Sequence, residues 1–251
     1  MVYHILNGDS LTERFKATHI PGQIVIMREC LIEGDLGGNT LTEFMDHRTR
    51  FLATTYDASP NEYSISGLIG KILHAPNHTE FNLWFEYDLF CMSNMWFLLS
   101  LMKSLNSSKN IFIIYSFWTT PAGRYRGFGP ATAQNLIDWY SRRIQCEQKD
   151  LELALALWNA YKINDVNTLE ELSSTKSVCF PYLEEVCFAH IDRFGINGEP
   201  GRPEKRIKAI LKEFPFADFN KVFMEFTRWE GIYGFGDLQL KHIFEKMIDP
   251  A

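Results

Sequence analysis

Residues 81–102 have the sequence FNLWFEYDLFCMSNMWFLLSLM. The first part, Phe81–Phe85, is an apolar and aromatic run of strand length, and the acidic residues Glu86 and Asp88 follow it closely. Leu89–Leu105 is then long enough for a helix and almost free of charge, which indicates a helix buried on all its faces. This stretch therefore predicts a buried strand that passes through a polar joint into a buried helix.

The same alternation of strand and helix occurs on both sides of this stretch. Apolar, β-branched runs predict further strands at Tyr3–Leu6, Gln23–Met27 and Ile111–Tyr115. Helical spacing predicts helices over residues 11–17, 42–55 and 64–74. Such alternation favours a mostly parallel sheet that is covered by helices on both faces. We therefore predict an α/β, Rossmann-like domain over residues 1–128.

The pattern changes after Gly129, where one helical pattern follows another. The predicted helices cover residues 131–149, 151–161, 204–214, 218–229 and 237–248. A Pro/Gly cluster at residues 198–203 predicts a linker before the last three helices. We therefore predict an all-helical C-terminal region over residues 129–251, in which residues 202–251 are candidates for a winged-helix-like unit.

The composition is that of a globular protein and excludes a disordered or fibrous chain. The 251 residues are 46% hydrophobic and 22% charged, with a net charge of −6 that argues against non-specific coating of nucleic acid. The longest apolar run, Leu89–Met102, is shorter than the roughly 20 residues of a membrane span. The first residues lack the pattern of a signal peptide, and the five cysteines include no CxxC pair. We expect a cytoplasmic protein with reduced thiols and no membrane partner, and the sequence indicates no oligomeric state.

Polar residues follow each predicted strand at the point where it ends. In an open parallel sheet these carboxyl ends lie at one edge, where ligands bind. The carboxylates Asp9, Glu86 and Asp88 are therefore predicted to meet there, as catalytic residues and as ligands of a metal ion. Neighbouring carboxylates repel one another unless a cation compensates them, and Mg²⁺ or Mn²⁺ would do so. The predicted ligand-binding residues around them are Asn7, Gly8, Ser10, Arg28, Glu29 and Arg124.

Each of these residues also has a plain structural interpretation. Asp9 orders a turn, Glu29 is solvated, and Glu86 and Asp88 cap the long helix. Ser10 and Glu13 have the spacing of a capping box, which would place Ser10 at the start of the first helix. Gly8 would let backbone N–H groups approach a phosphate, although the sequence there is neither GxGxxG nor a P-loop.

Two other classes of function remain open. Residues 8–11 spell GDSL, the motif in which the GDSL hydrolases carry a nucleophilic serine, and Ser10 would take that role. The later Gly-x-Asn-Asp and Asp-x-x-His blocks of those enzymes have no match here, which disfavours acyl hydrolysis. The mildly basic residues 202–251 allow a regulatory protein in which the α/β domain senses a ligand and the last helices contact a protein or DNA partner.

Several long motifs are similar to those of a bacterial family known as domain of unknown function 1835. The resemblance includes HILNGDSL at residues 4–11, VIMRECLIEG at 25–34 and LWFEYDLFC at 83–91, and shorter blocks at 157–161, 180–183, 202–207 and 236–239. Met92 stands where the family has Gln, and Asp35 where it has Pro. The resemblance implies an N-terminal α/β domain with a helical C-terminal extension, and it implies no activity.

The strand-end residues therefore carry the functional prediction. We expect a cytoplasmic protein that binds or hydrolyses a phosphorylated or nucleotide-like small ligand. Asp9, Glu86 and Asp88 would hold a metal or a ligand hydroxyl, and one of them would act as a general base. Arg28 and Arg124 would neutralise the ligand's negative charge.

Overall fold

The computed structural model describes residues 1–59, 64–105, 109–118 and 121–248, and its strands form one mostly parallel sheet. The strand order is β2-β1-β3-β4-β5, in which the first four strands are parallel and β5 runs antiparallel to β4. The strands are β1 (Val2–Asn7), β2 (Gln23–Met27), β3 (Glu80–Trp84), β4 (Asn110–Ile114) and β5 (Ile144–Gln145). The predicted α/β, Rossmann-like class and its four parallel strands are thus confirmed.

The sheet separates two apolar cores because successive side chains of a strand point to opposite faces. On one face Ile5, Leu83 and Ile113 join a large core. On the other face Leu6, Trp84 and Ile114 join a smaller one. Because the side chains on both faces of each strand are apolar, the strand sequences do not alternate between apolar and polar residues.

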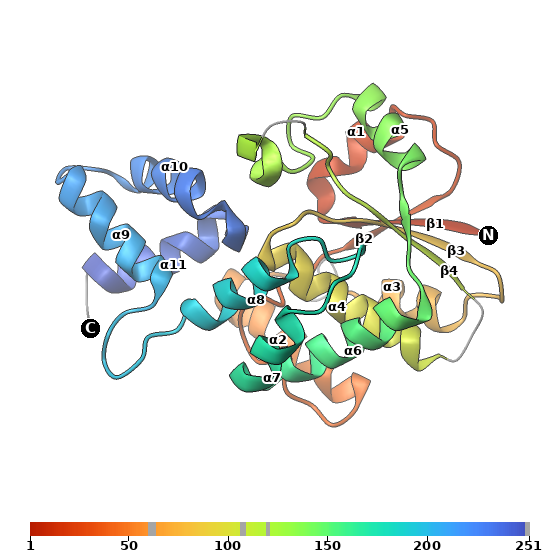
Figure 1. Cartoon of the computed structure of the whole chain (residues 1–251), viewed down its shortest axis with the longest axis horizontal. Helices are drawn as coiled ribbons and strands as arrows, with labels where there is room; N and C mark the ends of the chain where they lie inside the picture. The colour runs from red at the N-terminus through yellow and green to blue at the C-terminus, as the bar shows by residue number, and fades with distance from the viewer. Residues whose placement is uncertain (60–63, 106–108, 119–120, 249–251) are drawn as a thin grey trace.

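Helices cover both faces (Figure 1). The smaller core is covered by α1 (Thr12–Lys16) and α5 (Ala133–Ser141), through residues such as Phe15 and Leu136. The larger core is covered by α2 (Leu41–Tyr56), α3 (Ser66–Leu73) and α4 (Leu89–Ser104), with α6 (Gln148–Lys162) packed on α4. Because α4 lies between the sheet and this outer helix, it is buried on nearly all sides, as predicted.

The single helix predicted over residues 131–149 is wrong. The helix α5 ends at Ser141, and the chain then forms β5 before α6 begins at Gln148. The backbone N–H of Cys146 donates to the carbonyl of Ile111 at 2.8 Å, so this segment completes the edge of the sheet beside β4. Two shorter helices, α7 (Val166–Ser173) and α8 (Leu183–Asp192), follow and had not been predicted.

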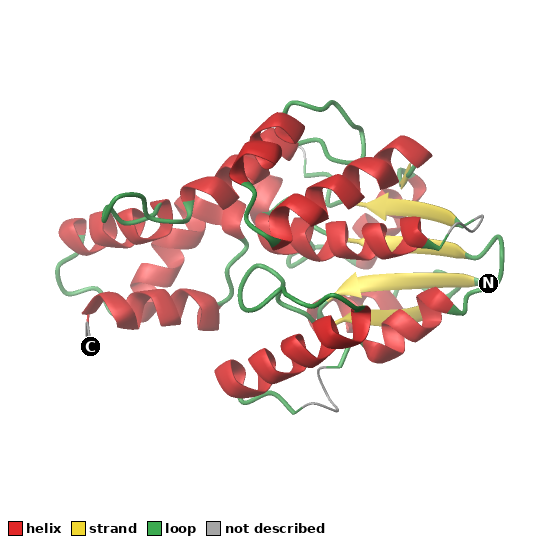
Figure 2. Cartoon of the chain, turned by 90° about the horizontal axis from the view of Figure 1, so that it is seen from below, coloured by secondary structure: helices red, strands yellow, loops and turns green. Residues whose placement is uncertain are grey.

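The last helices form a three-helix unit beyond the carboxyl ends of the strands, and the strand arrows point towards it (Figure 2). The unit consists of α9 (Arg202–Glu213), α10 (Phe219–Glu230), the 3₁₀ turn η3 (Gly231–Tyr233) and α11 (Asp237–Ile248). Residues 202–248 contain no β-strand, so the hairpin that would make a wing is missing there. None of the helices in the described part of the chain is both long and apolar enough to span a membrane.

Candidate functional site

A cavity of about 240 Å³ lies at the carboxyl ends of β1 and β3, and we call it the carboxylate cavity. Its polar floor contains Glu86, Asp88 and Cys91. Its other walls come from the β1 tip, the end of β3, the loop after β4 and the three-helix unit. They include Asn7, Ser10, Trp84, Tyr125, Phe128, Phe226, Glu230, Gly234 and Phe235. The cavity is therefore assembled from segments that are far apart in the sequence.

The strand order explains why a cavity forms at this place. From β1 the chain first adds β2 on one side and later adds β3 on the other side. The connections therefore leave β1 and β3 in opposite directions, which opens a crevice at the carboxyl ends between these two strands. In open α/β sheets, ligands bind at such a switch point.

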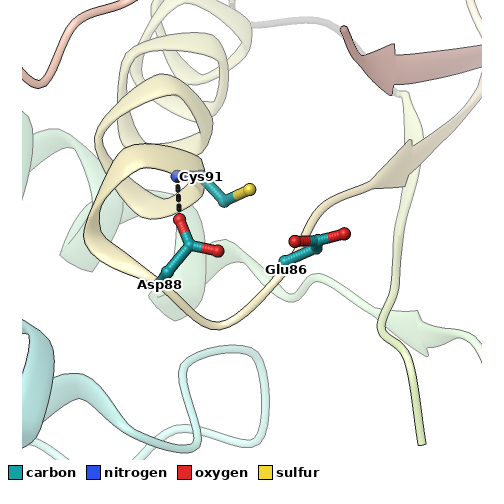
Figure 3. A group of neighbouring side chains, drawn as sticks. All are labelled: Glu86, Asp88 and Cys91. Carbon is teal, nitrogen blue, oxygen red and sulfur yellow. Dashed lines mark hydrogen bonds between the residues drawn. The ribbon is translucent and has the colours of Figure 1, made fainter. Parts of the chain in front are cut away.

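Glu86, Asp88 and Cys91 form the centre of this floor (Figure 3). One carboxylate oxygen of each acid and the thiol sulfur lie within 4.8 Å of one another. Asp88 is the N-cap of α4, and its Oδ1 accepts a hydrogen bond from the Cys91 N–H at 2.9 Å. Glu86 Oε1 accepts from the Phe128 N–H at 2.6 Å. Backbone donors thus fix both side chains while part of each carboxylate stays directed at the cavity.

Two glycines in the left-handed conformation touch these carboxylates. Gly127, with φ of 57°, is so close to Glu86 that a Cβ there would lie 2.0 Å from Oε1. Gly234, with φ of 62°, is equally close to Asp88, at 2.1 Å from Oδ1. Any side chain at either position would occupy the space of a carboxylate oxygen. At these two positions the loop after β4 and the three-helix unit therefore approach the acids through backbone atoms.

The cavity carries uncompensated acidic groups. Among the described residues that line it, none is lysine, arginine or histidine. Burial, together with the charge of Asp88, raises the pKa of Glu86 to about 7. Burial likewise raises the pKa of Asp88 to about 6, against the opposing effect of its hydrogen bonds in the first turn of α4. A third acid, Glu230, differs because Arg202 and Arg206 each bind it at 2.8 Å.

A buried amide network positions the thiol. Asn7 donates from Nδ2 to the Cys91 sulfur at 3.0 Å, and its Oδ1 accepts from Asn94 Nδ2 at 2.8 Å. Asn94 also donates to the Glu29 carbonyl at 2.8 Å and accepts from the Leu31 N–H at 3.1 Å. The network links the ends of β1 and β2 to α4. Burial and the two nearby carboxylates raise the pKa of the Cys91 thiol, so the thiol is neutral when no cation is bound.

The structure does not bring Asp9 to Glu86 and Asp88. Asp9 binds Arg28 through two hydrogen bonds of 2.7 Å, and this contact lowers the pKa of the Asp9 carboxyl. The pair lines a second cavity, of about 270 Å³, on the β2 side of the β1 tip, which we call the Tyr56 cavity. Its lining also includes the predicted residues Gly8 and Glu29.

Glu29 is a buried structural residue, and the interpretation of a solvated side chain was wrong. Its Oε1 lies 2.7 Å from Arg48 Nη2, and both side chains are at most 2% exposed. Arg48 also donates to the carbonyls of Cys30 and Glu33. The pair therefore shapes the loop after β2.

The structure places the other predicted residues outside the carboxylate floor. The Gly8 N–H already donates to the carbonyls of Leu6 and Met27, both at 3.0 Å, so it does not point at a ligand. Arg124 binds Glu185 at 2.6 Å and lies 3.8 Å from the centre of the Tyr182 ring. The Arg124 guanidinium group is thus engaged by Glu185 and Tyr182 and does not line the carboxylate cavity.

Ser10 lines the carboxylate cavity but is not a helix cap. It lies inside a 3₁₀ turn, η1 (Asp9–Leu11), and Leu11 is the N-cap of α1. Glu13 instead pairs with Lys16 at 2.6 Å, so the predicted capping box is wrong. No histidine is present among the described lining residues to serve Ser10 as a base.

Sequence reasoning missed Cys91, Asn94 and the two glycines. The spacing Asp88-x-x-Cys91 was a usable signal, since a helix N-cap and the third residue after it lie close together. Asn94 was visible as a polar residue in an otherwise apolar helix. Gly127 and Gly234 had no local signal, because their partners lie far away in the sequence.

Comparison with known proteins adds no assignment. No protein-family model matches the chain, and no curated protein is similar to it. The resemblance to domain of unknown function 1835 therefore stays a prediction from motifs.

Proposed function

We propose that the protein binds a small phosphorylated ligand through a divalent cation that Glu86 and Asp88 hold in the carboxylate cavity. The observation that carries this proposal is the meeting of the half-buried Glu86 carboxylate, the buried Asp88 carboxylate and the Cys91 thiol within 4.8 Å, in a cavity with no cationic side chain in its described lining. Such a pair needs either a proton or a cation.

The donor set favours a hard cation. Mg²⁺ and Mn²⁺ take carboxylate oxygens and keep other positions for water or substrate phosphate. The Cys91 thiol must lose its proton before it binds a metal, and its raised pKa opposes this loss. We therefore expect the two carboxylates to be the main ligands, with the thiol coordinating only softer ions such as Zn²⁺.

The charge of the cavity also decides how an anion would enter. A free phosphate would be repelled by Glu86 and Asp88, whereas a phosphate bound to the cation would be attracted. Phosphorylated ligands thus suit this cavity only together with the metal. Hydrolysis would further need a group that accepts a proton from water, and Glu86 and Asp88 are both assigned to the cation. Binding is the function that the geometry supports best.

Titration of the metal-free protein with Mn²⁺, followed by electron paramagnetic resonance, tests the proposal. We expect one strong site per chain, weakened at least tenfold in Glu86→Gln because a neutral amide replaces a charged ligand. The exposed variant Glu13→Gln is the matched control and should bind Mn²⁺ like the unmodified protein. Absence of a strong site, or equal binding by Glu86→Gln, would refute the proposal.

A further inference from the structure

The Tyr56 cavity has the character of a site for an organic ring. Its walls are mainly apolar and include Met27, Leu52, Tyr56, Ala58, Phe90 and Leu238. A few polar groups converge at its edge, from Asp9, Arg28 and Gln239. A concave apolar surface with a small number of placed polar groups is the usual composition of a small-molecule pocket.

The polar groups keep hydrogen-bonding capacity for a ligand. The Tyr56 hydroxyl accepts a bond from Gln239 Nε2 at 3.1 Å, and it still has its own proton to donate. Each Asp9 oxygen accepts one bond from Arg28 and retains a further lone pair. One side of the cavity thus offers a donor to a ring acceptor, and the other offers an acceptor to hydroxyl groups.

The two cavities adjoin each other. Phe90 lines both, and the β1 tip separates them, since Asn7 and Ser10 face the carboxylate cavity while Gly8 and Asp9 face the Tyr56 cavity. Cavities of about 240 and 270 Å³ together fall in the range of roughly 300–1,000 Å³ that is typical of ligand pockets. The two cavities thus share one lining residue and lie on opposite sides of one turn.

The same three-helix unit covers both cavities. Gly234 and Phe235 close the carboxylate cavity, and Leu238 and Gln239 close the Tyr56 cavity. Gln239 also accepts from the Gly236 N–H at 2.9 Å, which ties the two closing segments together. A ligand that occupied both cavities would contact one continuous segment of this unit, residues 234–239.

We infer that the two cavities form one binding site for a nucleoside monophosphate, with the base in the Tyr56 cavity and the phosphate on the cation in the carboxylate cavity. This inference rests on the proposed function for the position of the phosphate. The base would pack between Tyr56 and the apolar wall, and the Asp9 carboxylate would accept hydrogen bonds from the sugar hydroxyls.

Calorimetric titration of the full chain with Mn²⁺ present compares AMP, GMP, CMP and UMP with ribose 5-phosphate, which lacks the base. We expect at least one nucleotide to bind at least tenfold more tightly than ribose 5-phosphate. Tyr56→Ala should remove this difference and leave the affinity for Mn²⁺ and for ribose 5-phosphate unchanged. His242→Ala is the matched control, because His242 stacks on Tyr56 at 5.5 Å but does not line the cavity.

The possible failures are distinguishable. Equal binding of all four nucleotides and ribose 5-phosphate would overturn the inference without affecting the cation site. An equal effect of Tyr56→Ala on both kinds of ligand would overturn it too. Base-dependent binding that is equally tight after the metal is removed with a chelator would retain the Tyr56 cavity and refute the proposed function. If Tyr56→Ala does not fold, Tyr56→Phe tests the hydroxyl, and the comparison of ligands needs no variant.

Discussion

Replacing Glu86 with glutamine should make the metal-free protein more stable at alkaline pH. The pKa of Glu86 is raised from 4.5 to about 7 in the folded protein. Between these values the folded state binds more protons than the unfolded state, so the free energy of unfolding falls as the pH rises. One pKa unit corresponds to about 1.4 kcal/mol, which gives an upper limit of roughly 3.5 kcal/mol for this shift. Because Glu86 is only partly buried and interacts with Asp88, we expect a loss of about 2 kcal/mol between pH 5 and pH 8.

The glutamine variant keeps the shape of the side chain and removes the charge. Its carbonyl oxygen can still accept from the Phe128 N–H, which binds Glu86 at 2.6 Å in the unmodified protein. Glu86→Gln should therefore match the unmodified protein at pH 4.5–5 and exceed it by about 2 kcal/mol at pH 8. Urea denaturation at both pH values in the presence of a chelator measures this difference.

Two further measurements make the prediction specific. Mn²⁺ should raise the stability of the unmodified protein at alkaline pH, because a ligand that binds only the folded state stabilises that state. The same Mn²⁺ concentration should stabilise Glu86→Gln much less. Glu13→Gln should leave the pH dependence as it is. A Glu86→Gln protein that is less stable than the unmodified protein at pH 8, or has the same pH dependence, would refute the electrostatic reasoning.

Two other substitutions test the surroundings of the site by urea denaturation. Gly234→Ala should lower the free energy of unfolding by about 2–4 kcal/mol, since it adds a steric clash with Asp88 to the backbone strain. Gly198→Ala is the control, because Gly198 has φ of 84° and open space around it, and it should cost only about 1 kcal/mol. Similar losses in the two variants would contradict the clash. Arg48→Ala should lower the free energy of unfolding by about 3–5 kcal/mol, because it leaves the Glu29 carboxylate buried without its cation. Arg50 is exposed, and Arg50→Ala should change the free energy of unfolding by less than about 0.5 kcal/mol. A small loss in Arg48→Ala would mean that water or a proton compensates the Glu29 charge.

Most of the N-terminal fold follows from short stretches of sequence. The runs at residues 23–27 and 81–85 place apolar side chains on both faces of a strand, so they can be stable only as strands with helices on both faces. The long apolar helix after Asp88 must likewise be surrounded by protein. Whether a segment is buried on all sides depends on its own run of apolar residues, and so the local sequence predicts it.

The sequence also determined that acids would stand at strand ends, and the tertiary structure decided which of them meet. Glu86 and Asp88 are joined by Cys91 because α4 begins directly after β3. Asp9 lies on the other side of the β1 tip, where Arg28 binds it. The side to which a turn residue points depends on loop geometry and on distant partners, which periodicity does not encode.

The closure of the site depends entirely on contacts between distant segments. Gly127 and Gly234 touch the carboxylates across 41 and 146 residues of sequence, respectively. The strand β5 and the Glu29–Arg48 pair are also decided by long-range neighbours. Hydrophobic periodicity reports only whether a residue faces a core. The choice of partner is set by packing and charge in the folded chain, and so the candidate site becomes visible only there.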